Sequence, residues 1–112
     1  MIENLEFLDN FLQDSWKEVN HYHLNPLQRS ILLLHHLLPW VKHHFKSGEK
    51  YQELRNKHSE LALVQRGMMT YNFEGKFYIQ LKDDLLVIPV NLAHSVEIGT
   101  GEDCIVYTYY KQ

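Results

Sequence analysis

The sequence lacks the features of a disulfide-bonded, membrane-spanning or nucleic-acid-binding protein. Cys104 is the only cysteine in 112 residues, so an intrachain disulfide is excluded. The formal net charge is -3 and like charges form no run, which disfavours nucleic acid and anionic membranes as partners. The longest apolar run, residues 31–38, is interrupted by two histidines and is too short to span a bilayer. The first ten residues contain acidic side chains and lack the basic region and long apolar run of a signal peptide, so we expect a cytoplasmic protein.

The residues that are present indicate one domain in two parts. Apolar residues make up 45% of the chain, which is enough for a core in a single domain of this length. Turn residues and short apolar runs replace helical periodicity from residue 40 onward. We therefore expect a helical segment over residues 1–39 and a β-barrel over residues 40–112, together forming one structural domain.

Two helices are predicted in the first part. Apolar residues recur every three or four positions over residues 2–19. Asn25 followed by Pro26 is a typical helix start, and this second helix would extend to Leu38 before Pro39. Leucines lie almost all round the second helix, more than a surface helix needs to bury. The surplus predicts a subunit interface, and so a homodimer, with the helices packing on their own barrel or on the partner's.

Short strands are predicted in the second part. They are separated by turn residues, and Glu74-Gly75 is typical of a hairpin between two of them. Such a pattern favours a sandwich or barrel. The predicted strands are residues 40–45, 60–64, 68–73, 76–81, 85–88 and 105–110.

Two stretches of this part place turn and ionisable residues at defined spacings. The first is Gly48-x5-Leu54-x-Asn56-x3-Glu60-x6-Gly67, and the second is Asp83-x5-Pro89-x-Asn91-x2-His94. They resemble the two motifs of the cupin superfamily, G-x5-H-x-H-x3/4-E-x6-G and G-x5-P-x-G-x2-H-x3-N. The resemblance implies a mainly β fold, a single RmlC-like jelly-roll barrel, preceded here by about two N-terminal α-helices. It covers roughly residues 40–110.

The departures from the cupin motifs fall into two groups. Asp83 and Asn91 stand at glycine positions, and both residue types tolerate a positive φ, so the turns remain compatible with the fold. Leu54 and Asn56 stand where the motif has histidines, and Ile98 stands at the final asparagine. The implied metal site is therefore degenerate.

Glu60 and His94 are the two ligand positions that remain. A cupin site typically offers three imidazoles and a carboxylate to iron, manganese, nickel, copper or zinc, and two ligands hold such metals poorly. We therefore expect no cofactor. The alternative is a divalent metal held by Glu60, His94 and His58, since His58 would share the face of Glu60 in an extended strand. His43 and His44 are adjacent, so only one of them can face inward as a substitute ligand.

A polar pocket in an apolar barrel is the function that these residues favour. It would bind a small polar molecule, with isomerase-like acid/base chemistry that needs no tightly bound metal. The alternatives are a metal-dependent oxygenase or lyase with an altered ligand set, and a non-catalytic structural or regulatory dimer. Whether the protein is an enzyme stays open. The predicted site consists of Glu60 and His94 as catalytic residues and Asn56, His58, Tyr71 and Tyr107 as ligand-binding residues.

Two further groups of reactive side chains are interpreted as structural. His21-Tyr22-His23 lies between the predicted helices with no glutamate at the motif spacing, which favours a solvated loop. Cys104 follows Glu102 and Asp103, which would raise a thiol pKa, so we expect a small core residue.

Overall fold

The computed structural model describes residues 17–34 and 39–111. No helix in these ranges is long and apolar enough to cross a membrane. The described residues contain one helix, α2 (Pro26–Leu34), and nine strands. The strands are β1 (Asn20–His23), β2 (Val41–Phe45), β3 (Lys50–Leu54), β4 (Ser59–Arg66), β5 (Met69–Phe73), β6 (Lys76–Gln80), β7 (Asp84–Ile88), β8 (His94–Ile98) and β9 (Cys104–Lys111).

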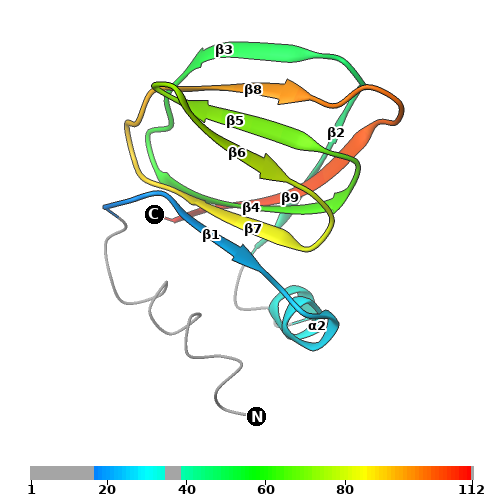
Figure 1. Ribbon diagram of the computed structural model, residues 1–112. Helices are drawn as coiled ribbons and strands as arrows, with labels where there is room; N and C mark the ends of the chain where they lie inside the picture. Colours follow the sequence, from blue (N-terminus) through cyan, green and yellow to red (C-terminus); the bar gives the residue numbers. More distant parts are fainter. Residues whose placement is uncertain (1–16, 35–38, 112) are drawn as a thin grey trace.

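The strands form two antiparallel sheets that lie face to face (Figure 1). The larger sheet has the order β1-β7-β4-β9-β2, and the smaller has the order β3-β8-β5-β6. Strand β4 is central in the larger sheet, where it pairs with β7 on one side and with β9 on the other. This is the arrangement of a jelly roll, so the mainly β fold class is confirmed.

The second predicted helix is present as α2, and its predicted continuation over residues 35–38 lies outside the described residues. The first predicted helix also lies outside them, apart from residues 17–19, which are not helical. The six predicted strands and the Glu74-Gly75 hairpin are observed with shifts of one or two residues at their ends. Strands β1 and β3 were not expected, since both are short and largely exposed, and the ninth strand, β8, begins at His94, the last residue of the second motif stretch.

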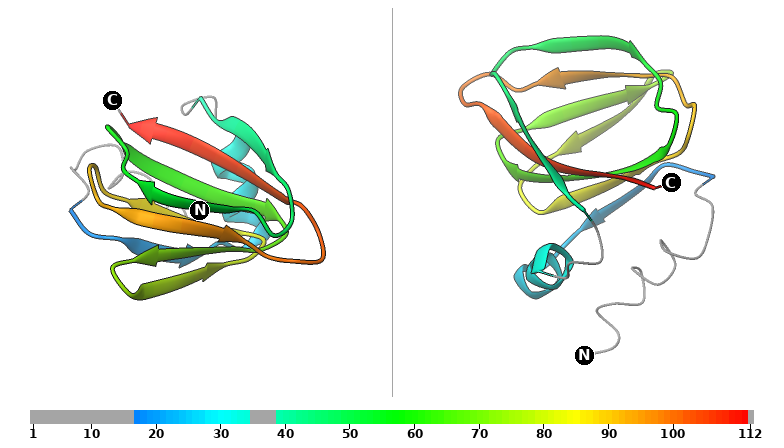
Figure 2. Two further views of the ribbon diagram at one scale, coloured as in Figure 1. Left: turned by 90° about the horizontal axis from the view of Figure 1, so that it is seen from above. Right: turned by 180° about the vertical axis from the view of Figure 1, so that it is seen from behind.

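The larger sheet is apolar on both faces. Its inner face contributes Ala62, Val64, Leu86 and Ile88 to a core between the two sheets. Side chains alternate along a strand, so the intervening residues of β4 and β7 face outward. These outward residues form a second buried cluster with Leu24 and with Leu32 of α2, which packs outside the sandwich (Figure 2). Part of the leucine surplus of the second helix is therefore covered within the same chain.

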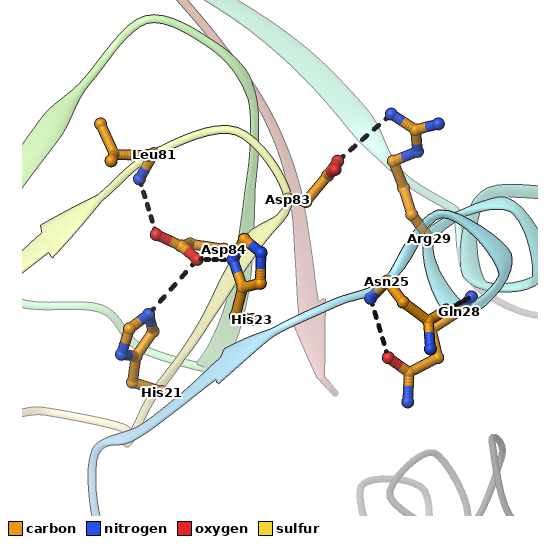
Figure 3. Close-up of polar contacts among 8 residues, drawn as sticks. All are labelled: His21, His23, Asn25, Gln28, Arg29, Leu81, Asp83 and Asp84. Carbon is orange, nitrogen blue, oxygen red and sulfur yellow. Dashed lines mark hydrogen bonds and ion pairs between the residues drawn. The ribbon is translucent and has the colours of Figure 1, made fainter.

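Strand β1 corrects the interpretation of His21-Tyr22-His23 as a solvated loop. It is an edge strand that pairs with β7, and the His23 Nδ1 lies 2.6 Å from the Asp84 Oδ1. The His21 Nε2 lies 3.6 Å from the same oxygen (Figure 3). The sequence pattern missed this strand because Asp84, the residue that both histidines contact, is more than sixty positions away.

Helix α2 begins as its start signal predicts. The Gln28 backbone nitrogen donates to the Asn25 Oδ1 at 2.8 Å, and the Asn25 backbone nitrogen donates to the Gln28 Oε1 at 2.9 Å. Each side chain thus satisfies a backbone donor of the other, as in a capping box (Figure 3). The Arg29 Nη1 donates to the Asp83 Oδ1 at 3.2 Å, which attaches the helix to the turn before β7.

The turns of the two motifs have the predicted backbone. Asp83 and Asn91, which replace motif glycines, have φ values of 73° and 61°. Gly48 and Gly67 also have positive φ, at 79° and 82°. The two glycines differ in their surroundings, because a Cβ on Gly67 would lie 2.7 Å from the Asp103 carbonyl oxygen, whereas one on Gly48 would meet nothing within 4 Å.

We predict that Gly67→Ala destabilises the protein much more than Gly48→Ala. Both substitutions place a β-carbon at positive φ, which costs about 1 kcal/mol. Only Gly67→Ala also drives that carbon into backbone atoms, which adds about 1–3 kcal/mol. Chemical denaturation of the two variants and the wild type measures the difference. Equal losses of stability would show that the approach of Gly67 to Asp103 has no energetic weight.

Candidate functional site

A cavity of about 300 Å³ lies between the two sheets. Its walls are largely apolar, with side chains such as Leu54, Val96 and Val106. We call it the barrel cavity. The ionisable and polar side chains that line it are His43, Tyr51, Asn56, Glu60, Tyr71, His94, Thr108 and Tyr110.

Glu60 lies near the start of β4, where it faces the barrel cavity because the next residue, Leu61, faces the outer cluster. Only 7% of Glu60 is exposed to solvent. The Asn56 Nδ2 donates a hydrogen bond to the Glu60 Oε1 at 2.5 Å. Burial raises the pKa of Glu60 from 4.5 to about 7, and the bond from Asn56 opposes this shift only in part. Near neutral pH the carboxyl group is therefore partly protonated.

His94 begins β8 and is 6% exposed. Its Nδ1 lies 2.8 Å from the Leu92 carbonyl oxygen. A carbonyl oxygen can only accept, so the Nδ1 carries the proton and the Nε2 is the basic nitrogen of the neutral ring. Burial lowers the pKa of His94, although its bond to Leu92 acts in the opposite direction. The imidazole is accordingly neutral at pH 7.

Aromatic rings surround His94 in the barrel. The ring of Phe73 lies 5.2 Å from that of His94, and the ring of Tyr71 lies 6.1 Å away, measured between centroids. Tyr71 is buried, which raises its pKa well above the usual value, with a further contribution from the nearby charge of Glu60. Its hydroxyl therefore stays protonated and serves as a hydrogen-bonding group in the wall of the barrel cavity.

His43 is the member of the His43-His44 pair that faces inward. Its Nε2 lies 2.9 Å from the Thr108 Oγ1, and both residues line the barrel cavity. His44 faces outward, where its Nε2 donates to the Asp103 Oδ2 at 2.8 Å. Because successive side chains of a strand point to opposite faces, only one of the two histidines can face the barrel cavity. The pairing of β2 with β9 decides that it is His43.

Two of the predicted site residues do not line the barrel cavity. His58 is exposed in the bend before β4, so the extended backbone assumed for it is absent and it does not share the face of Glu60. Tyr107 faces the outer cluster beside Leu63. Thr108 and Tyr110 of the same strand line the barrel cavity instead. From Cys104 to Tyr110, every residue of this strand is apolar, aromatic or β-branched. The sequence therefore shows no alternation of polar and apolar residues from which the inward face could be predicted.

In their present arrangement, the donors around Glu60 and His94 do not form a site for a metal ion. In the described part of the chain, no three histidine, cysteine, aspartate or glutamate side chains form a group that could hold one. Leu54 stands at the position of the first motif histidine and has no atom that could bind a metal. The amide of Asn56, at the position of the second, donates to Glu60. Among the described residues, His43 is the only further imidazole in the wall of the barrel cavity, and its Nε2 contacts the Thr108 hydroxyl.

Cys104 is fully buried, as expected for a small core residue. Burial, followed by the charge of Glu102, raises the pKa of its thiol to about 11. Since the thiolate is the reactive form, this cysteine is not a nucleophile at neutral pH.

Solved structures of known proteins share the fold of this chain. No family model and no curated protein matches the chain. A DUF861 family protein from Thermotoga maritima matches with a TM-score of 0.64 at 19% identity, over 84% of this chain and 100% of that one. A cupin superfamily protein from Desulfitobacterium hafniense matches with a TM-score of 0.57 at 16% identity, over 94% and 88%. An RmlC-like cupin from Shewanella frigidimarina matches with a TM-score of 0.54 at 20% identity, over 88% and 82%.

These likenesses, together with the two sheets and their strand order, show that the chain has the cupin fold. The resemblance seen in the motif spacing is thereby confirmed for the fold. Identities of 20% or less carry no activity from those proteins to this one.

We predict that Glu60 makes the stability of the protein fall as the pH rises from about 4.5 to about 7. In this range the unfolded chain has released the Glu60 proton and the folded chain still binds it, so raising the pH favours unfolding. A shift of this size corresponds to a loss of about 3 kcal/mol that is complete above pH 7. Glu60→Gln cannot ionise and should remove this loss, as measured by denaturant unfolding on either side of the range.

The difference between the wild type and Glu60→Gln gives the contribution of Glu60 to the pH dependence, because every other ionisable group is present in both proteins. Glu97→Gln, at an exposed position of β8, is the matched control and should keep the wild-type pH dependence. If Glu60→Gln loses as much stability with pH as the wild type, Glu60 is an ordinary solvated carboxylate and this prediction is wrong.

Proposed function

We propose that this cupin-fold protein binds a small polar molecule in the barrel cavity and that Glu60 and His94 exchange protons with it, without a tightly bound metal. The reaction class would be that of an isomerase or epimerase, in which a proton is removed at one atom and added at another. The ligand would enter beside Tyr110, which lines the barrel cavity and is 40% exposed.

The observation that carries this proposal is the opposite perturbation of two ionisable groups in one cavity. Burial raises the pKa of Glu60 to about 7 and lowers that of His94. Near neutral pH a protonated Glu60 can donate a proton, while the neutral imidazole can accept one at its Nε2. A general acid and a general base with such values work most efficiently close to neutral pH.

The rest of the barrel cavity suits a compact ligand with both polar and apolar faces. A volume of about 300 Å³ is at the lower end of the range for small-molecule sites. Tyr71 and Tyr110 provide ring faces and hydroxyls, and His43 and Thr108 provide a further polar pair on the larger sheet. These groups would orient a planar or sugar-like molecule.

One observation favours the metal-dependent alternative. His43 faces the barrel cavity, where rotation away from Thr108 would free its Nε2 as a third ligand beside Glu60 and His94. An oxygenase or lyase with this altered ligand set is therefore the second candidate. The barrel cavity argues against the third alternative, a purely structural dimer, since such a protein has no need of a hollow core. The homodimer and the cytoplasmic location remain predictions.

The test combines metal analysis with a ligand screen. Protein purified without an affinity tag or chelator is analysed for metal, and a library of small polar molecules is screened by thermal shift. We expect no stoichiometric metal and a small set of compounds that raise the Tm of the wild type. Glu60→Gln and His94→Ala should each abolish the shift, because each removes a polar group from the wall of the barrel cavity.

The matched controls are Glu97→Gln and His44→Ala, which make the same changes outside the barrel cavity. Both should keep the wild-type shifts. Near-stoichiometric metal that Glu60→Gln and His94→Ala lose would overturn the metal-free proposal in favour of the second candidate. Compounds that stabilise all four variants equally would place the binding elsewhere and contradict the proposal.

A further inference from the structure

A second cavity, of about 550 Å³, lies outside the sandwich and shares no residue with the barrel cavity. It is open to solvent on the outer face of the larger sheet, beside α2. Four basic side chains line it, and each comes from a different element: Arg29 of α2, Lys42 of β2, Arg66 of β4 and Lys82 of the turn between β6 and β7. We call this cavity the basic groove.

The charge of the basic groove is opposite to that of the whole protein. The chain has a formal net charge of -3, yet among the described residues Glu102 is the only acid that lines the groove. Arg66 donates to Glu102 at 3.2 Å, and Arg29 donates to Asp83 at 3.2 Å (Figure 3). These two acids hold the guanidinium groups in place and leave a surplus of two positive charges among the residues that the structure describes.

Lys42 and Lys82 supply that surplus. Both are exposed, and neither forms an ion pair within the described residues. Cations that lie close together without counter-charges repel one another. A bound anion would replace this repulsion with attraction. The two lysines are consequently free to close on a ligand from β2 and from the turn after β6.

The backbone around the basic groove is shaped to present these side chains. The register between β4 and β9 shifts between Val64 and Arg66, so Gln65 is an extra residue in β4. Such a bulge redirects successive side chains, and both Gln65 and Arg66 line the groove. The chain then turns at Gly67, which approaches the Asp103 backbone too closely for a side chain. The position of Arg66 is thus set by a bulge on one side and a tight turn on the other.

We propose that the basic groove binds a small molecule that carries two or more linked phosphoryl groups. Planar guanidinium groups suit the paired oxygens of a phosphate, and lysines add point charges that need no fixed geometry. One exposed ion pair binds weakly, so a ligand must engage several of the four cations at once. The groove has the volume of a small-molecule site and spans four elements, which suits a chain of phosphoryl groups better than a single one.

Titration with inorganic tripolyphosphate, followed by amide NMR shifts of the whole chain, tests this proposal. We expect saturable shifts at Gln65, Gly67 and Lys82, and binding that weakens as salt is added. Citrate, a compact polyanion without phosphorus, should bind several-fold more weakly. Shifts confined to the surroundings of Glu60 and His94 would place the anion in the barrel cavity and overturn the proposal, as would equal binding of citrate.

Two double variants with the same change of charge separate the basic groove from general electrostatic attraction. Lys42→Ala with Lys82→Ala should raise the Kd for tripolyphosphate by about tenfold or more, because both unpaired cations of the groove are lost. Lys50→Ala with Lys76→Ala removes two exposed lysines from the smaller sheet and should change the Kd by less than about twofold. Equal effects of the two double variants, or no saturable binding by the wild type, would overturn the proposal.

Discussion

Burial of strand β4 on both faces is the constraint on which the rest of the structure depends. Its inward side chains form the floor of the barrel, and its outward leucines require cover from α2 and its neighbours. The same alternation directs Glu60 into the barrel, where apolar surroundings change its proton affinity. The end of the strand, displaced by a bulge, directs Arg66 to the basic groove. One strand thereby contributes to the fold and to both cavities.

The barrel cavity shows how apolar surroundings change the proton affinity of the ionisable groups that line it. Without a cation, a buried carboxylate is costly, and protonation is the cheapest way to reduce that cost. Asn56 stabilises the ionised form of Glu60 with one hydrogen bond, which a histidine bound to a metal would not do. His94 is likewise neutral, because burial lowers its pKa more than the hydrogen bond to the Leu92 carbonyl raises it. Apolar walls therefore make Glu60 a weak acid and His94 a weak base.

Much of the fold could be predicted from the sequence because its signals are local. Turns need particular residues, so Asp83 and Asn91 at positive φ followed from the motif spacing. The start of α2 followed from Asn25 and Pro26 for the same reason. Glu60 and His94 were placed by that spacing too, and both line the barrel cavity. Strand β1 was missed, because its stability comes from pairing with β7 and from Asp84, which are remote in the sequence.

The sequence by itself determined the class of fold, the turns and the identity of the two ionisable residues that keep the motif spacing. Only the tertiary structure decided which side of each strand faces the barrel: His43 instead of His44, and Thr108 instead of Tyr107. The physical reason is that a strand of mixed side chains can be buried on either face, so the choice depends on its register with distant neighbours. The basic groove could not be predicted from the sequence for the same reason, since its four cations come from separate elements and meet only in the tertiary structure.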